Sequence, residues 1–98
     1  MKKLFLVIAF LIFTSTAQAA SDVEEEIESC KQAARKNPDD AEAHYNLGVA
    51  YASSGMYKEA IEAYKQAIKI APDSANVHYN LGVAYGNSGM YEEAIEAF

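Results

Sequence analysis

Two histidines, one cysteine and several carboxylates are the residues of this chain whose types could support chemistry. His44 and His78 lie 34 residues apart, and a histidine pair can bind a metal ion or transfer protons. Cys30 is the single cysteine, and a thiol can act as a nucleophile or form an intermolecular disulfide. Glutamates at 24–26 and 92–93 could serve acid–base catalysis.

These residues lack the companions that such chemistry needs. Two histidines are half of a usual zinc set, so His44 and His78 are interpreted as packing residues. Cys30 corresponds in the repeat described next to Tyr64 and Phe98, so a small buried hydrophobe is the favoured interpretation and a reactive thiol is the alternative. The carboxylates have no accompanying nucleophile, phosphate loop or ligand cluster and are interpreted as solvated helix faces. We therefore predict no enzymatic activity, no catalytic residue, no cofactor and no metal.

An internal repeat of 34 residues organises the chain. When the sequence is shifted by that length, Ala41–Tyr64 align with Ala75–Phe98, and 18 of the 24 pairs are identical. Both copies contain His-Tyr-Asn-Leu-Gly-Val-Ala-Tyr, followed by Ser-Gly-Met-Tyr. A period of this length is typical of stacked supersecondary units, each of which buries its apolar face against its neighbours.

Each copy predicts two amphipathic helices joined by a turn. In the first helix, residues at i, i+3, i+4 and i+7 share one face, as in His44, Leu47, Gly48 and Tyr51. Gly55 is expected to close this helix, because glycine adopts the left-handed conformation at low cost. A second helical pattern follows over 57–70, and Pro72 ends it, with Asp73 or Ser74 available as the N-cap of the next helix.

Small residues are expected to bring the two helices of a hairpin close together. Gly48 and Ala60 should let the helix axes approach, while Tyr51 and Tyr64 should supply most of the buried apolar area. The outer side of a hairpin must then be covered by the next unit. Upstream, residues 22–36 read as one further helix.

The spacing resembles the tetratricopeptide repeat, whose pattern is Trp-x2-Leu-Gly-x2-Tyr, then Ala-x3-Phe, then Pro. The residues that carry the resemblance are His44, Leu47, Gly48, Tyr51, Ala60, Tyr64 and Pro72, and then His78, Leu81, Gly82, Tyr85, Ala94 and Phe98. Histidine stands where the pattern has tryptophan. The resemblance implies an all-α fold of helix-turn-helix repeats stacked as a right-handed superhelix. It also implies a degenerate half repeat at 20–40, a first repeat at 41–74 and a second, truncated repeat at 75–98.

In this family the first helices of successive repeats line a concave groove that holds a peptide or an extended segment of a partner. One such row of side chains lies opposite the hairpin-packing face of each first helix. The resemblance implies that this row binds the partner, and a plain solvated surface is the alternative. The predicted binding residues are Glu42, Tyr45, Asn46, Val49, Ser53, Asn76, Tyr79, Asn80, Val83 and Asn87.

The first residues have the composition of a secretory signal. Lys2 and Lys3 precede ten apolar residues at 4–13, and Ala17-Gln18-Ala19 is a small-x-small cleavage site. Ten residues are half of the roughly 20 that a membrane span needs. We therefore expect a signal peptide at 1–19, no membrane span after its cleavage, and a periplasmic or secreted protein.

The charge balance argues against a nucleic-acid partner. The chain has 8 Lys and Arg against 14 Asp and Glu, for a net charge of −6, and phosphate binding needs a basic surface. Removing Lys2 and Lys3 with the signal takes the mature part to 6 minus 14, or −8.

Together these features predict a protein–protein interaction module of the bacterial cell envelope that binds a protein or an extended peptide. The alternative is a structural spacer or self-association segment of a longer exported protein, with its functional domain beyond residue 98. Self-association is expected through the uncapped C-terminal repeat, around Tyr85, Ile95 and Phe98.

The signal predicts the N-terminus of the mature protein. Cleavage after Ala19 or Ala20 should leave Ala20 or Ser21 as the first residue, because signal peptidase accepts small residues around the cleaved bond. Intact-mass measurement of the exported protein checks this, and a mass that includes residues 1–19 would contradict it.

Overall fold

The computed structural model describes residues 22–98, and all the regular structure in that range is helical. The helix nearest the N-terminus in this range covers 22–36, as expected from the sequence. Four further helices follow: α2 (Ala41–Ser53), α3 (Tyr57–Ile70), α4 (Ala75–Asn87) and α5 (Tyr91–Ala97). The predicted signal peptide lies outside the described residues. Within the described range, no helix is both long and apolar enough to cross a membrane.

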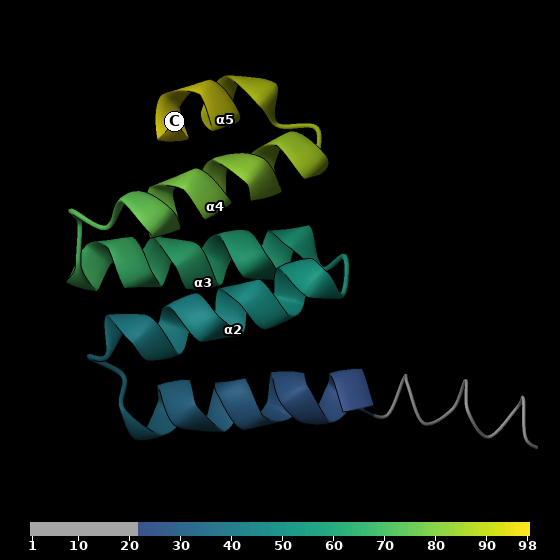
Figure 1. The fold of residues 1–98 in the computed structure, drawn as a ribbon, viewed down its shortest axis with the longest axis vertical. Helices are drawn as coiled ribbons and strands as arrows, with labels where there is room; N and C mark the ends of the chain where they lie inside the picture. The colour runs from purple at the N-terminus through teal and green to yellow at the C-terminus, as the bar shows by residue number, and fades with distance from the viewer. Residues whose placement is uncertain (1–21) are drawn as a thin grey trace, which may run out of the picture.

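The helices are stacked in chain order as a series of antiparallel hairpins. Figure 1 shows the 22–36 helix at one end of the stack, α5 at the other, and α2, α3 and α4 between them. Because each helix packs mainly on its neighbours in the chain, the fold is a layered stack in which each layer covers the one before it.

Glycine turns close the first helix of each hairpin. Gly55 has φ +75° and Gly89 has φ +85°, in the left-handed region that favours glycine. After α2, the amide of Met56 donates to the carbonyl of Tyr51 over 2.9 Å, and the amide of Gly55 donates to Ala52 over 3.0 Å. This pair of bonds is the Schellman motif, and it satisfies carbonyls that the helix end would leave free. The expected role of Gly55 is confirmed.

The starts of the first helices differ from the expectation in one detail. Asp40 caps α2, and its side chain accepts a hydrogen bond from the amide of Glu42 over 3.0 Å. Ser74 occupies the equivalent N-cap of α4 but forms no side-chain capping bond. One expected cap position is therefore right, while its hydrogen bond is absent.

A glycine of each first helix meets an aromatic ring of the second helix. A Cβ atom added at Gly48 would lie 2.5 Å from Cε1 of Tyr64, and one added at Gly82 would lie 2.7 Å from Cε1 of Phe98. Ala60 of the second helix is completely buried. The predicted close approach of the two helices is thus confirmed.

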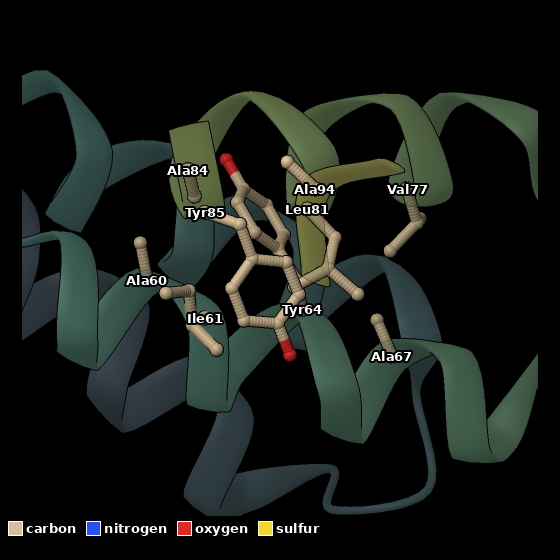
Figure 2. Packing of buried hydrophobic residues seen from close by; sticks show 9 residues of the cluster. All are labelled: Ala60, Ile61, Tyr64, Ala67, Val77, Leu81, Ala84, Tyr85 and Ala94. Carbon is tan, nitrogen blue, oxygen red and sulfur yellow. The ribbon is translucent and has the colours of Figure 1, made fainter. Parts of the chain in front are cut away.

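The core forms between hairpins as well as within them (Figure 2). The cluster joins α3, α4 and α5, and its buried members are Ala60, Ile61, Tyr64, Ala67, Val77, Leu81, Ala84, Tyr85 and Ala94. Tyr64 is 2% exposed, as expected for the main core aromatic, whereas Tyr51 is only half-buried at the edge of the cluster. Because α4 buries side chains from α3 of the preceding hairpin, neither hairpin completes its core alone.

The 22–36 helix makes a contact that recurs one repeat later. Lys31 Nζ lies 5.9 Å from the ring centroid of Tyr51, and Lys65 Nζ lies 5.9 Å from that of Tyr85. Both distances are within the range of a cation–π interaction. The two pairs are 34 residues apart, which is the period of the repeat, while the half repeat at 20–40 stays a prediction.

The glycine contact predicts opposite effects for two glycine substitutions. Gly48→Ala should lower the free energy of unfolding by about 1–3 kcal/mol, because its methyl group would overlap the buried Tyr64 ring. Gly86→Ala is the matched control, since the space around Gly86 in α4 is open and alanine favours a helix by up to about 1 kcal/mol. Urea unfolding followed by circular dichroism measures both, and equal stabilities would contradict the packing argument.

Candidate protein-binding groove

Two hollows lie between the first helices α2 and α4, and together we call them the α2–α4 groove. The first, the Glu42 hollow, has a volume of about 280 Å³ and is lined by Ala41, Glu42, Tyr45, Asn46, Ala71, Ser74, Asn76 and Val77. The second, the Val83 hollow, has a volume of about 150 Å³ and is lined by Val49, Ala52, Ser53, Tyr57, Tyr64, Asn80, Val83, Ala84 and Asn87.

The helical period places these side chains on one face of each first helix. Glu42, Asn46, Val49 and Ser53 advance by three or four residues, so they follow one another along the side of α2 that looks toward α4. The equivalent residues of α4 are Asn76, Asn80, Val83 and Asn87. The opposite side of α2, at His44, Leu47 and Tyr51, borders a separate hollow with α3.

The structure brings the predicted binding residues together, with one exception. All of them line the groove except Tyr79, which is 62% exposed. Tyr79 occupies on α4 the place that Tyr45 occupies on α2. Within the described residues, no first helix follows α4 to form a second wall, and the Tyr79 ring instead lies 5.7 Å from that of Phe98. Whether these residues bind a partner remains a prediction.

A hydrogen bond crosses the groove and makes the two predicted asparagines unequal. The Asn80 Nδ2 atom donates to the hydroxyl oxygen of Tyr45 over 2.9 Å. Asn80 is therefore half-buried and partly engaged, whereas Asn46 is exposed. Sequence reasoning placed both residues in one free row and missed this contact, because it joins residues 35 apart on neighbouring helices. The one feature of the sequence that could have suggested this bond is a tyrosine and an asparagine on consecutive first helices.

Tyr45 also contacts the core behind the groove. Its ring centroid lies 6.0 Å from that of Tyr64, with the planes tilted by 41°, an arrangement favoured between aromatic rings. Burial, followed by the nearby Tyr45, raises the pKa of Tyr64 to about 12. Tyr45 thus lines the groove and also contacts the buried core of its hairpin.

Charge in the groove is confined to one end. Among the described residues that line the two hollows, Glu42 is the single charged side chain. The remaining polar groups are mostly amides and hydroxyls. The Ser53 hydroxyl donates to the Val49 carbonyl over 2.9 Å, which leaves its oxygen available mainly as an acceptor. The groove can therefore offer hydrogen bonds along its length and a negative charge at the Glu42 end.

The two histidines have a structural role. Nε2 of His44 donates to the carbonyl of Pro38 over 2.9 Å, and Nε2 of His78 donates to Pro72 over 2.7 Å. Each bond joins the first turn of a first helix to the turn before it. In the part of the chain that the structure describes, no three His, Cys, Asp or Glu side chains are placed to hold a metal ion.

Cys30 and the acidic runs stand apart from the groove. Cys30 is half-buried rather than fully buried. Tyr64, at the equivalent position, is covered by α2 of its own hairpin, whereas no equivalent helix precedes that of Cys30 among the described residues. Burial, followed by the charge of Glu26, raises the pKa of the Cys30 thiol, which lowers the fraction of reactive thiolate. Glutamates at 24–26 and 92–93 are exposed, as expected for solvated helix faces.

Family comparisons match most of the described repeat region. Residues 50–89 match a model described as TPR repeat, and residues 29–62 match one described as Tetratricopeptide repeat. A search of curated protein sequences gave no match.

Solved structures of MamA resemble the whole stack. One MamA crystal structure is 32% identical, with a TM-score of 0.74, over 86% of this chain and 49% of that chain. A structure of MamA AMB-1 is 28% identical, with a TM-score of 0.75, over 82% of this chain and 44% of that one. This chain thus spans less than half the length of these MamA chains. The predicted fold class, an all-α superhelical stack of such hairpins, is confirmed.

The burial of Tyr64 predicts a loss of stability at high pH. Folding holds the phenol neutral up to a pKa of about 12, whereas an unfolded tyrosine ionises near pH 10. The unfolded chain therefore releases this proton first, and the free energy of unfolding should fall as pH rises from about 10 to 12. Urea unfolding should show a weaker decline in Tyr64→Phe than in the wild type, with Tyr79→Phe as the exposed control. Parallel pH curves for all three proteins would contradict this assignment.

Proposed function

We propose that the protein, whose residues 29–62 and 50–89 match tetratricopeptide-repeat models, is a non-catalytic scaffold that binds an extended segment of a partner protein in the α2–α4 groove. The observation that carries this proposal is the set of exposed polar and apolar side chains, among them Asn46 and Val83, on the facing sides of α2 and α4. The side of α4 that carries Tyr85 is by contrast buried in the core.

The chemistry of the groove suits a peptide backbone. Asparagine side chains can both donate and accept hydrogen bonds, so they can hold an extended main chain without requiring one sequence. Tyr45 at the floor adds apolar contact at a low entropy cost, since its ring is already fixed against Tyr64.

We place this scaffold in the bacterial cell envelope on the basis of the first residues alone. The positive start, the apolar run and Ala17-Gln18-Ala19 support export to the periplasm or the outside of the cell. The acidic balance of the chain supports a protein partner rather than a nucleic acid.

The second candidate is a spacer or self-association segment of a longer exported protein. Its support is the apolar surface at the α5 end of the stack, where Ile95 is 75% exposed and Phe98 is 68% exposed. Tyr85, expected from the sequence to belong to this surface as well, is instead buried against α3 in the core. A partner that uses this surface would contact the end of the stack and leave the groove empty.

Replacing Asn46 and Asn80 together by alanine tests the proposal. Binding of a crosslink-identified partner peptide should weaken by about 1–3 kcal/mol, at about 0.5–1.5 for each hydrogen-bonding side chain. Helix content should remain unchanged, because Asn46 is exposed and the side chain of Asn80 bonds to the groove residue Tyr45 rather than to the helix backbone. Isothermal titration calorimetry measures the affinities.

Gln66→Ala is the matched control for this titration. It removes an exposed amide from α3, at the hollow on the opposite side of α2. Lys65 would be a poor control, because it lies over the Tyr85 ring and 3.9 Å from Glu62. Equal affinities for the wild type, the double variant and Gln66→Ala would move the binding site off the groove and favour the second candidate.

A further inference from the structure

The α2–α4 groove has two chemically different ends. The Glu42 hollow contains the one carboxylate of the lining, together with the amides of Asn46 and Asn76. The Val83 hollow is lined by Val49, Val83 and two tyrosines, and by no charged side chain among the described residues. A segment that fills both hollows must therefore present different side chains at its two ends.

The hollow with the carboxylate is suited to a cationic side chain. Glu42 is exposed, and the neighbouring Asp40 adds a second negative charge at the start of α2. No Lys or Arg belongs to the described lining of either hollow, so a positive group from a partner would meet attraction and no repulsion. The Tyr45 ring beside Glu42 could also contact the stem of a lysine or arginine.

The distance between the hollows sets the spacing of the two side chains. Val49 follows Glu42 by seven residues on α2, and Val83 follows Asn76 by seven residues on α4. At 1.5 Å per residue, each pair is about 10 Å apart along its helix. A polyproline-II segment rises about 9 Å over three residues, and residues three apart lie on the same side of it. In a β-strand, residues three apart point to opposite sides.

The walls of the groove also suit a polyproline-II segment. Tyr45 lines one hollow, and Tyr57 lines the other, above the deeply buried Tyr64 ring. Aromatic-lined grooves bind this conformation because it is preformed and leaves its backbone carbonyls free. The free amide donors of Asn46 and Asn76 can bond to those carbonyls.

From this geometry we infer that the partner segment is a proline-rich polyproline-II stretch with a basic residue in the Glu42 hollow and an apolar residue three positions away in the Val83 hollow. This inference rests on the proposed function and specifies its ligand. The hydrogen bond between Asn80 and Tyr45 joins a lining residue of one hollow to a lining residue of the other, so the ligand backbone would pass over it between the two side chains.

Defined peptides test the inference on the full chain. The probe is an end-blocked, fluorescein-labelled proline-rich peptide of about ten residues, with one lysine and one leucine three positions apart. Companion peptides carry glutamine or glutamate in place of the lysine, or place the two residues at a spacing of two. Fluorescence anisotropy should show tighter binding of the probe than of every companion, by roughly 3–10-fold for the glutamine peptide.

Glu42→Gln identifies the group responsible for the preference. This variant should bind the lysine and glutamine peptides equally, whereas Glu59→Gln, which removes an exposed carboxylate from α3 on the other side of α2, should keep the preference. Circular dichroism checks that both variants retain their helix content.

The outcomes separate this inference from the proposed function. An unchanged lysine preference in Glu42→Gln, an equal affinity at the wrong spacing, or no saturable binding of the probe would each overturn the inference. The proposed function would survive any of these results if the partner peptide still depended on Asn46 and Asn80. Loss of that dependence would overturn the proposed function itself.

Discussion

The contact between a glycine and an aromatic ring within each hairpin determines the rest of this structure. The Tyr64 ring occupies the space that a side chain at Gly48 would need, and Phe98 does the same at Gly82. With the helices this close, Ala60 and Ala67 are completely buried, because small side chains fill the remaining space without gaps. Close contact at this point lets Tyr64 take part in the cluster that also includes side chains of the next hairpin.

Each first helix contacts different neighbours on its different sides, and α4 shows this most clearly. Gly82 meets α5, while Leu81 and Tyr85 join the cluster that includes Ile61 of the preceding hairpin. Packing therefore specifies those positions tightly. The remaining side, with Asn80 and Val83, faces α2 across the groove. Side chains on this side can be chosen for binding without disturbing the core, which is why a stack of repeats suits recognition of a partner.

Fold and groove are nevertheless connected through Tyr45. Its ring packs on Tyr64 in the core, and its hydroxyl accepts the hydrogen bond from Asn80 on the next first helix. The same side chain thus forms part of the groove floor and joins consecutive repeats. A groove whose walls are held in this way loses little conformational freedom when a ligand binds. The carboxylate of Glu42 at one end then gives the groove a direction that the repeated asparagines alone would not supply.

The helices, their turns and the row of groove residues can all be derived from the amino-acid pattern. Its 34-residue period and the position of Gly55 fixed the hairpins, because helical periodicity and left-handed glycine conformations are local properties of the chain. It also placed residues such as Asn46 and Val49 on one helix face. Three features could not be derived in this way: the hydrogen bond of Asn80 to Tyr45, the place of Tyr79 outside the groove, and the bonds of the histidines to proline carbonyls. These outcomes depend on distances between neighbouring helices, and such distances are set by packing rather than by the pattern along one helix.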